Sequence, residues 1–149
     1  MERDDKQAVF GCAVAFLVVA GVIASLYVWY TIQFNRRQIE IDGFYQSRSV
    51  LRDMREATLQ SNDPSSAAQQ ALLTRFPVGT DRERVVEALG QDGFKCEQAD
   101  RNRRRRPGQI SVECYLAAPA QTSYTSWQVQ LLFNLDNRLE EAIVMTYTI

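Results

Sequence analysis

The sequence contains no histidine and only two lysines, Lys6 and Lys95. Histidine is the side chain that most often transfers protons near neutral pH, activates serine or cysteine nucleophiles and binds transition metals. Its absence removes the catalytic mechanisms that depend on these roles. The remaining candidates for acid–base chemistry are scattered carboxylates: Glu97, Glu113, Glu140 and Glu141. We therefore expect a protein that is not an enzyme and that binds neither a cofactor nor a metal ion.

Cysteine and net charge are also scarce. There are three cysteines, Cys12, Cys96 and Cys114, and without histidine they are too few for a structural zinc site, which takes four ligands. The formal net charge is −1, so no overall field draws the protein toward nucleic acid. We expect no nucleic-acid partner.

An uncharged apolar run of 25 residues, 8–32, dominates the N-terminal part of the chain. A helix needs about 20 apolar residues to cross the hydrocarbon core of a bilayer, and a buried helix of a soluble protein rarely runs so long without a polar face. Aromatic side chains that suit the headgroup level gather at its far end: Tyr27, Trp29, Tyr30 and Phe34. These features predict a transmembrane helix over residues 8–34, after a short tail over 1–7.

Two other interpretations of this segment fit less well. A cleaved signal peptide begins with a positive region, whereas here Arg3 and Lys6 are outnumbered by acidic residues. A lipoprotein signal places its apolar stretch before the modified cysteine, whereas nearly all of this stretch follows Cys12. We expect the segment to be retained as a helix.

Small residues recur four positions apart within this helix, a spacing that lets a second helix approach closely. The pairs are Gly11 with Ala15, Ala20 with Ala24, and Gly21 with Ser25. Glycine and alanine are also common in membrane helices without any packing role, and both interpretations stay open. No ionisable residue lies between Gln7 and Asn35, so the helix offers no proton relay and is expected to be an anchor or a docking helix.

The following segment, 35–62, is mixed and charged. Its apolar residues recur at roughly helical spacing, which predicts a helical stalk or linker, interrupted near Gly43. These residues are Phe44, Val50, Leu51, Met54 and Leu59. After it, a globular domain over 63–149 begins with two helices. Asp63 and Pro64 are a favourable cap and first residue for a helix that ends at Pro77. Thr80 and Glu83 have the spacing of a capping box for a second helix over 81–89.

Beyond Gly93 the apolar period changes from 3.6 to 2, which indicates four strands. Their inward sides are expected to carry Phe94 and Cys96; Ile110, Val112, Cys114 and Leu116; Trp127, Val129, Leu131, Phe133 and Leu135; and Leu139, Ile143, Met145 and Tyr147. Asp136 and Asn137 would form a two-residue hairpin turn. Two helices followed by four antiparallel strands predict a two-layer α+β domain.

Cys96 and Cys114 lie nine positions either side of Arg105. If the strands around them form a hairpin centred there, the two cysteines face each other at a Cα separation of about 4.5–5.5 Å, within disulfide reach. The alternative is a pair of buried thiols. A disulfide implies an oxidising compartment. The same register sets Glu97 opposite Glu113, an unfavourable pair of like charges unless arginine side chains from the loop between the two strands screen it.

A known family has a similar pattern. The residues that carry the resemblance are Phe76-Pro77-Val78-Gly79-Thr80, then Val85, Val86, Leu89 and Gly90, then Cys96 and Cys114, and the strand from Trp127 to Phe133 with Leu139. Over about residues 72–149 the chain resembles the SmpA/BamE superfamily, and it resembles even more one repeat of the β-lactamase inhibitor protein fold, which pairs cysteines on the matching hairpin. The resemblance implies an envelope-facing, non-enzymatic binding module. Members on the BamE side are lipoproteins and the inhibitor has two repeats, whereas this chain has a membrane helix and one repeat.

An arginine-rich segment separates the first two expected strands. Its members are Arg101, Arg103, Arg104, Arg105 and Arg106. Like charges repel, so a solvated hairpin tip is one interpretation. The other is a loop that binds an acidic protein surface or anionic headgroups, for which arginine is well suited.

Two features of the sequence disagree about the side of the membrane on which the domain lies. Basic residues are more numerous after the apolar helix than before it, which favours a cytoplasmic domain under the positive-inside rule. The cysteine geometry and the family resemblance favour the opposite side, and we follow them. We expect a single-pass protein of the bacterial inner (cytoplasmic) membrane with a periplasmic C-terminal domain. It would contact membrane lipids and serve as an accessory subunit that binds or stabilises an integral membrane protein complex; the alternative is a free-standing inhibitor or sensor that captures a soluble envelope protein.

Overall fold

The computed structural model describes residues 2–99 and 108–148, with side chains from Phe16 onward. The chain divides into two compact units that meet between Ile39 and Glu40. We call them the helical unit and the α+β unit. Helix α1 (Glu2–Gln46) forms the helical unit, and its last turns belong to the α+β unit.

The helical unit contains the predicted membrane-spanning segment. The candidate span is Phe16–Gln46, and its most apolar 18 residues have a mean hydropathy of 1.7 and include no buried residue. The large apolar side chains of this part, among them Leu17, Ile23 and Leu26, are exposed. Because a soluble protein would cover such a surface, the exposure agrees with a helix that is long and apolar enough to cross a membrane.

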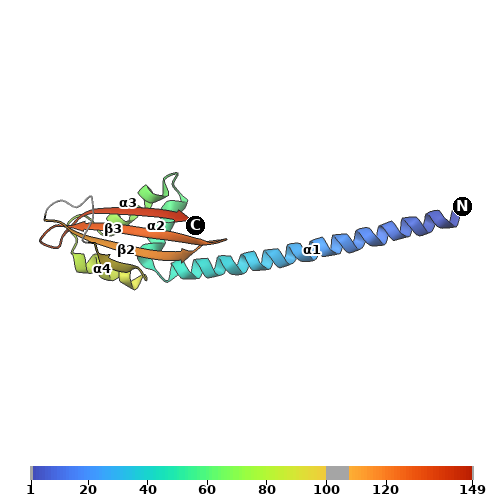
Figure 1. The fold of residues 1–149 in the computed structure, drawn as a ribbon, viewed down its shortest axis with the longest axis horizontal. Coiled ribbons are helices and arrows are strands. Elements are labelled where there is room, and N and C mark those ends of the chain that lie inside the picture. Colours follow the sequence, from blue (N-terminus) through green and yellow to red (C-terminus); the bar gives the residue numbers. More distant parts are fainter. Residues whose placement is uncertain (1, 100–107, 149) are drawn as a thin grey trace. The chain divides into compact units, whose positions relative to one another are not determined.

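The rest of the described chain forms three further helices and four strands, as Figure 1 shows. The helices are α2 (Ser49–Leu59), α3 (Pro64–Arg75) and α4 (Arg82–Gln91), and the strands are β1 (Lys95–Gln98), β2 (Ile110–Pro119), β3 (Tyr124–Phe133) and β4 (Leu139–Thr148). The strands form one antiparallel sheet in the order β1-β2-β3-β4. The α+β class with an N-terminal candidate span is therefore confirmed.

The sequence predicted the N-terminal cap of α3 correctly but not that of α4. The side chain of Asp63 accepts a hydrogen bond from the Ser66 backbone N–H at 3.2 Å, and Pro64 is the first residue of α3, as expected. The capping box of α4 is not formed. The residue that precedes the helix is Asp81 rather than Thr80, and it makes no side-chain cap. The hydroxyl of Thr80 donates to the carbonyl of Pro77 at 2.6 Å.

The core lies between the helices and one face of the sheet. Trp127, Val129, Leu131 and Phe133 of β3 are buried there, as their alternation predicted. The helices contribute buried apolar residues from α2, α3 and α4: Val50, Leu51, Met54, Ala68, Leu72, Val85 and Leu89. One continuous core therefore joins all the elements of the α+β unit.

The segment predicted as a stalk differs from the structure. Helix α2 is part of the helical layer, since Val50, Leu51 and Met54 are fully buried, and Ile41 and Tyr45 at the end of α1 join the same core. The compact unit begins at Glu40 rather than at residue 63. The interruption between the helices falls after Gln46 instead of near Gly43, which is inside α1. Because the segment contains many charged residues, the sequence did not reveal that one face of helix α2 is apolar enough to be buried.

The inward face of β4 also differs from the prediction. Leu139 is buried as expected, but Ala142 and Val144 face the core, and Ile143, Met145 and Tyr147 lie on the opposite side. The register between β3 and β4 shifts at Leu132/Phe133. An extra residue at such a bulge reverses the sidedness of everything that follows it.

The β3–β4 hairpin has a longer turn than the two residues expected. The backbone N–H of Asn134 donates to the Arg138 carbonyl at 2.9 Å, and the Asn134 carbonyl accepts from the Asn137 N–H at 3.0 Å, which leaves three residues in the loop. Asn137 has a φ of 57°, the left-handed conformation that three-residue hairpin loops require at this place and that asparagine tolerates.

Candidate functional site

The predicted disulfide is present. Cys96 and Cys114 are directly opposed across β1 and β2, and their sulfurs are bonded. Cys114 is buried in the core and Cys96 packs against it. The bond ties a short edge strand to the ten residues of β2, so its role within the α+β unit is to hold the sheet edge.

The side of the sheet opposite the core is covered by none of the described helices, and we call it the open face. Its accessible residues are Lys95 and Glu97 of β1; Glu113, Tyr115 and Ala117 of β2; Ser126, Gln128 and Gln130 of β3; and Ile143, Met145 and Tyr147 of β4. The register places Ser111, Leu132 and Glu141 on the same side, but Ser111 and Leu132 are buried, so that row is not part of the accessible surface. Among them Tyr115 is 43% exposed, Met145 40% and Tyr147 51%. A sheet that is helix-covered on one side thus presents an accessible surface on the other.

A chain of hydrogen bonds orders the middle of the open face. The Tyr115 hydroxyl donates to one carboxylate oxygen of Glu113 at 2.6 Å, and the Gln130 amide donates to the other at 3.3 Å. The Gln128 amide in turn donates to the Tyr115 hydroxyl at 3.2 Å. The hydrogen bond to Glu113, followed by desolvation and by the negative charges of Glu113 and Glu97, raises the pKa of Tyr115 above its ordinary value of 10.0.

Two carboxylates face each other at the β1 end of this network. Glu97 and Glu113 are directly opposed, as the sequence predicted. Among the described residues, no arginine or lysine forms an ion pair with either carboxylate. Like charges in opposed positions of an antiparallel pair are destabilising, so among the described residues this end of the open face carries two carboxylates without an ion-pair partner, beside Lys95 in the next row.

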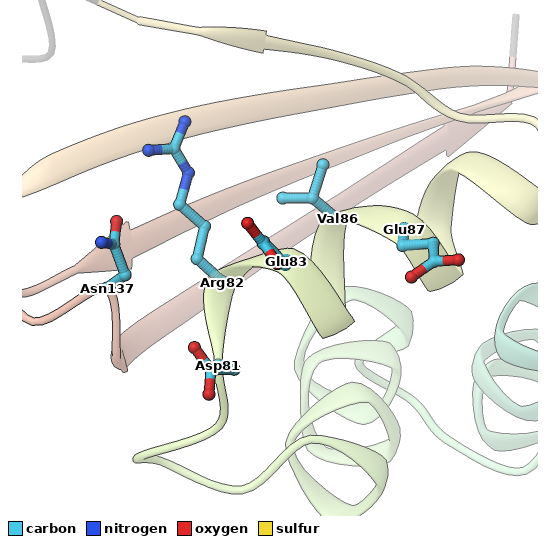
Figure 2. A pocket seen from close by; sticks show the side chains of 6 residues that line it. All are labelled: Asp81, Arg82, Glu83, Val86, Glu87 and Asn137. Atoms are coloured by element: carbon cyan, nitrogen blue, oxygen red, sulfur yellow. The ribbon is translucent and has the colours of Figure 1, made fainter.

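A second candidate region is a hollow of about 800 Å³ beside α4, shown in Figure 2. It is lined by Asp81, Arg82, Glu83, Val86, Glu87 and Asn137. In Figure 2 the side chains of Arg82 and Val86 extend from the same side of α4, whereas Asp81 points away from them. Asp81 forms an ion pair with Arg138 at 2.8 Å. The lining mixes both charges around one apolar side chain, so it lacks the apolar wall that small-molecule sites usually have.

The structure describes only some of the other residues that the sequence suggested for helix packing or partner binding. On α1, Gly21 has open space around its Cα, and the Ser25 hydroxyl donates to the Gly21 carbonyl at 2.9 Å, which satisfies the hydroxyl within the helix. Ala24 and Ser25 line a shallow hollow on the helix surface with Val28, Trp29 and Ile32, and Ala20 is exposed. The side chains of Gly11 and Ala15, and the whole arginine-rich segment, lie outside the described residues.

One feature of the site, its ordered hydrogen-bond network, was not found from the sequence. The ordered network was missed because Tyr115, Gln128 and Gln130 look like ordinary outward residues; only the register brings them together. The sequence feature that could have indicated the network is the alternation of apolar and polar residues, which places these three side chains on the same side of β2 and β3. In the described part of the chain no group of three or more cysteine and acidic residues is arranged to hold a metal ion.

No family model matches the chain, and no curated protein or solved structure is significantly similar to it. The class of protein therefore follows from its own features. It has an apolar helix able to cross a membrane and an α+β unit that combines a disulfide-tied sheet edge with an accessible sheet face.

Proposed function

We propose that this protein is a membrane-anchored, non-enzymatic accessory subunit. Its helix holds the α+β unit at a membrane, and that unit binds or stabilises a larger integral membrane protein complex. The observation that carries the proposal is the open face, where exposed Tyr115, Met145 and Tyr147 adjoin an ordered polar network. Aromatic and methionine side chains are enriched at protein interfaces, and the order of the network lowers the entropy lost on binding.

The location that we propose is the bacterial inner membrane, with the α+β unit in the periplasm. The Cys96–Cys114 bond supports an oxidising compartment, and the resemblance to the SmpA/BamE superfamily supports an envelope role. The helix contacts lipids through its exposed apolar side chains. The arginine-rich segment, 101–106, adds a contact to an acidic protein surface or to anionic headgroups.

The proposal is tested by gentle detergent extraction, affinity purification of the full chain and mass spectrometry of the co-purifying proteins. We expect a stoichiometric integral membrane complex. Met145→Lys places a charge on the open face and should release the complex. The matched control is Leu135→Lys, because Leu135 is 75% exposed in the β3–β4 turn, away from the open face, and it should leave the complex intact.

Recovery of the wild-type chain alone would contradict the accessory role and would favour the capture of a soluble envelope protein. The location is tested separately with a reporter that is active only outside the cytoplasm, fused after Ile149. Activity is expected. An inactive fusion, together with an active cytoplasmic reporter at the same site, would place the domain on the side that the positive-inside rule favours.

A further inference from the structure

The open face has two chemically different ends. Its cross-strand rows are Glu97, Glu113, Gln130 and Ile143, and beside them Lys95, Tyr115, Gln128 and Met145. One end, on β1 and β2, presents the opposed carboxylates. The other end, on β4, presents half-buried Ile143 and the exposed side chains of Met145 and Tyr147. A partner that covers the whole face must match both ends.

We propose that the open face docks a basic protein segment that carries arginine or lysine next to apolar side chains. This inference rests on the proposed function, and it adds the chemistry of the surface that the partner presents. The cation would lie over Glu97 and Glu113, and the apolar side chains over Ile143, Met145 and Tyr147. Neighbouring strands are about 4.8 Å apart, so the two groups of the partner are separated by about 10–15 Å.

Charge supports this occupant over an acidic or neutral one. Residues 40–149 carry 15 acidic and 13 basic residues, and five of the basic ones are the arginines of segment 101–106. Among the described residues of the open face, Lys95 is the only cation and it forms no ion pair, whereas Glu97, Glu113 and, further along β4, Glu141 are negative. A bound cation would relieve the repulsion between the opposed carboxylates.

The fixed geometry of Glu113 supports an arginine in particular. Both oxygens of its carboxylate already accept a hydrogen bond, from Tyr115 and from Gln130, so the group is held in one orientation and keeps further lone pairs for a donor. A guanidinium is planar and can donate to two carboxylates or stack on a tyrosine ring. Tyr115 offers such a ring in the next row.

The first test uses the full chain in lipid nanodiscs and an immobilised synthetic peptide, Arg-Arg-Gly-Ser-Gly-Leu-Phe, whose three-residue spacer spans about 10 Å when extended. We expect binding that weakens at high salt. The double variant Glu97→Gln/Glu113→Gln should lower the affinity by about three- to twentyfold, the effect of two exposed ion pairs. The control variant Glu83→Gln/Glu87→Gln removes the same charge from α4 and should leave the affinity unchanged.

Peptides with glutamate in place of arginine, or serine in place of leucine and phenylalanine, should bind less tightly. The proposal is overturned if the wild-type chain does not bind the first peptide, or if both double variants behave alike. It is also overturned if binding appears only after Arg103–Arg106 are neutralised, since the occupant would then be the chain's own segment.

A second measurement does not involve a partner. Glu97→Gln alone should raise the unfolding temperature of the free chain, and more so at low salt, because it removes the repulsion from Glu113. A lower unfolding temperature would mean that the carboxylate is already neutralised in the free molecule, and would contradict the proposal. The two proposals can be tested separately. If the co-purifying complex is retained by Glu97→Gln/Glu113→Gln but lost with Met145→Lys, the accessory role stands and the docking of a basic segment is overturned.

Discussion

At the residue scale, Asp92 links two helices that are distant in the sequence. Its side chain is 5% exposed, and one carboxylate oxygen accepts a hydrogen bond from the Leu51 backbone N–H at 2.7 Å. Leu51 is in the first turn of α2, where backbone N–H groups have no partner within the helix. The residue before α2, Arg48, makes no side-chain cap; its guanidinium donates to the Asp92 carbonyl at 2.9 Å. Asp92 therefore caps α2 from the end of α4.

Replacing Asp92 with alanine should lower the free energy of unfolding by about 1–3 kcal/mol, because it leaves a buried N–H without an acceptor. Asp92→Asn keeps an acceptor oxygen and should cost less. Urea denaturation of the detergent-solubilised chain, followed by tryptophan fluorescence, measures both. Asp136→Ala, in the exposed turn, is the control and should change the free energy by less than about 0.5 kcal/mol. Equal effects at the two positions would contradict the capping role.

Tyr115 gives a prediction about pH. Its pKa is raised chiefly by the hydrogen bond to Glu113, so Glu113→Gln should lower that pKa toward 10.0, the ordinary value. A raised folded-state pKa means that the stabilisation is complete below the unfolded-state value and is lost as pH rises through the folded-state value. An ultraviolet titration of the wild type, Glu113→Gln and Tyr115→Phe measures this. An unchanged tyrosine titration in Glu113→Gln would contradict the hydrogen bond.

At the scale of single elements, the edge strand β1 depends on its disulfide. β1 has four residues, and its bond to β2 closes a loop with a sequence separation of 18. A loop of this size corresponds to about 3 kcal/mol of stabilisation, because the bond restricts the unfolded chain. The hydrogen bonds of so short a strand contribute little by themselves.

The double variant Cys96→Ser/Cys114→Ser should therefore lower the free energy of unfolding by about 2–4 kcal/mol, whereas Cys12→Ser should leave it nearly unchanged. In protein that is denatured without reduction, an alkylating reagent should label Cys12 alone, as read by mass spectrometry. Labelling of all three cysteines would show that the disulfide is absent from the mature protein, and it would remove the argument for an oxidising compartment.

At the scale of the whole molecule, the boundary between the units decides which fragment can fold. The core includes Ile41 and Tyr45 from α1 and Val50, Leu51 and Met54 from α2. Each buried apolar side chain of this size contributes about 1.5–3 kcal/mol, so together they match the entire stability of a typical domain, about 5–15 kcal/mol.

A fragment over 40–149 should consequently unfold in a cooperative transition, whereas a fragment over 64–149 should not fold. Both can be purified with the disulfide intact and compared by near-ultraviolet circular dichroism and thermal unfolding. A cooperative transition of the shorter fragment, at a temperature close to that of the longer one, would contradict the placement of α2 in the core.

How much of this protein could be predicted from its sequence depended on whether a feature is encoded locally. The uncharged run before Asn35, the alternation in β3 and the equal spacing of Cys96 and Cys114 about the hairpin are all visible along the chain. They predicted a helix long and apolar enough to cross a membrane, the sheet and the disulfide, because period and spacing are properties of neighbouring residues. The opposition of Glu97 and Glu113 followed from the same register.

The rest was decided only by tertiary contacts. The bulge at Leu132/Phe133 reversed the sides of Ile143 and Met145, and so moved two apolar side chains from the expected core to the open face. A segment rich in charged residues forms helix α2, whose apolar residues Val50, Leu51 and Met54 are buried in the core, and Asp92 at the end of α4 caps that helix. Neither result can be predicted from the local sequence pattern. Which side of a strand faces the core, and whether a helix is buried, depend on the elements that pack against them.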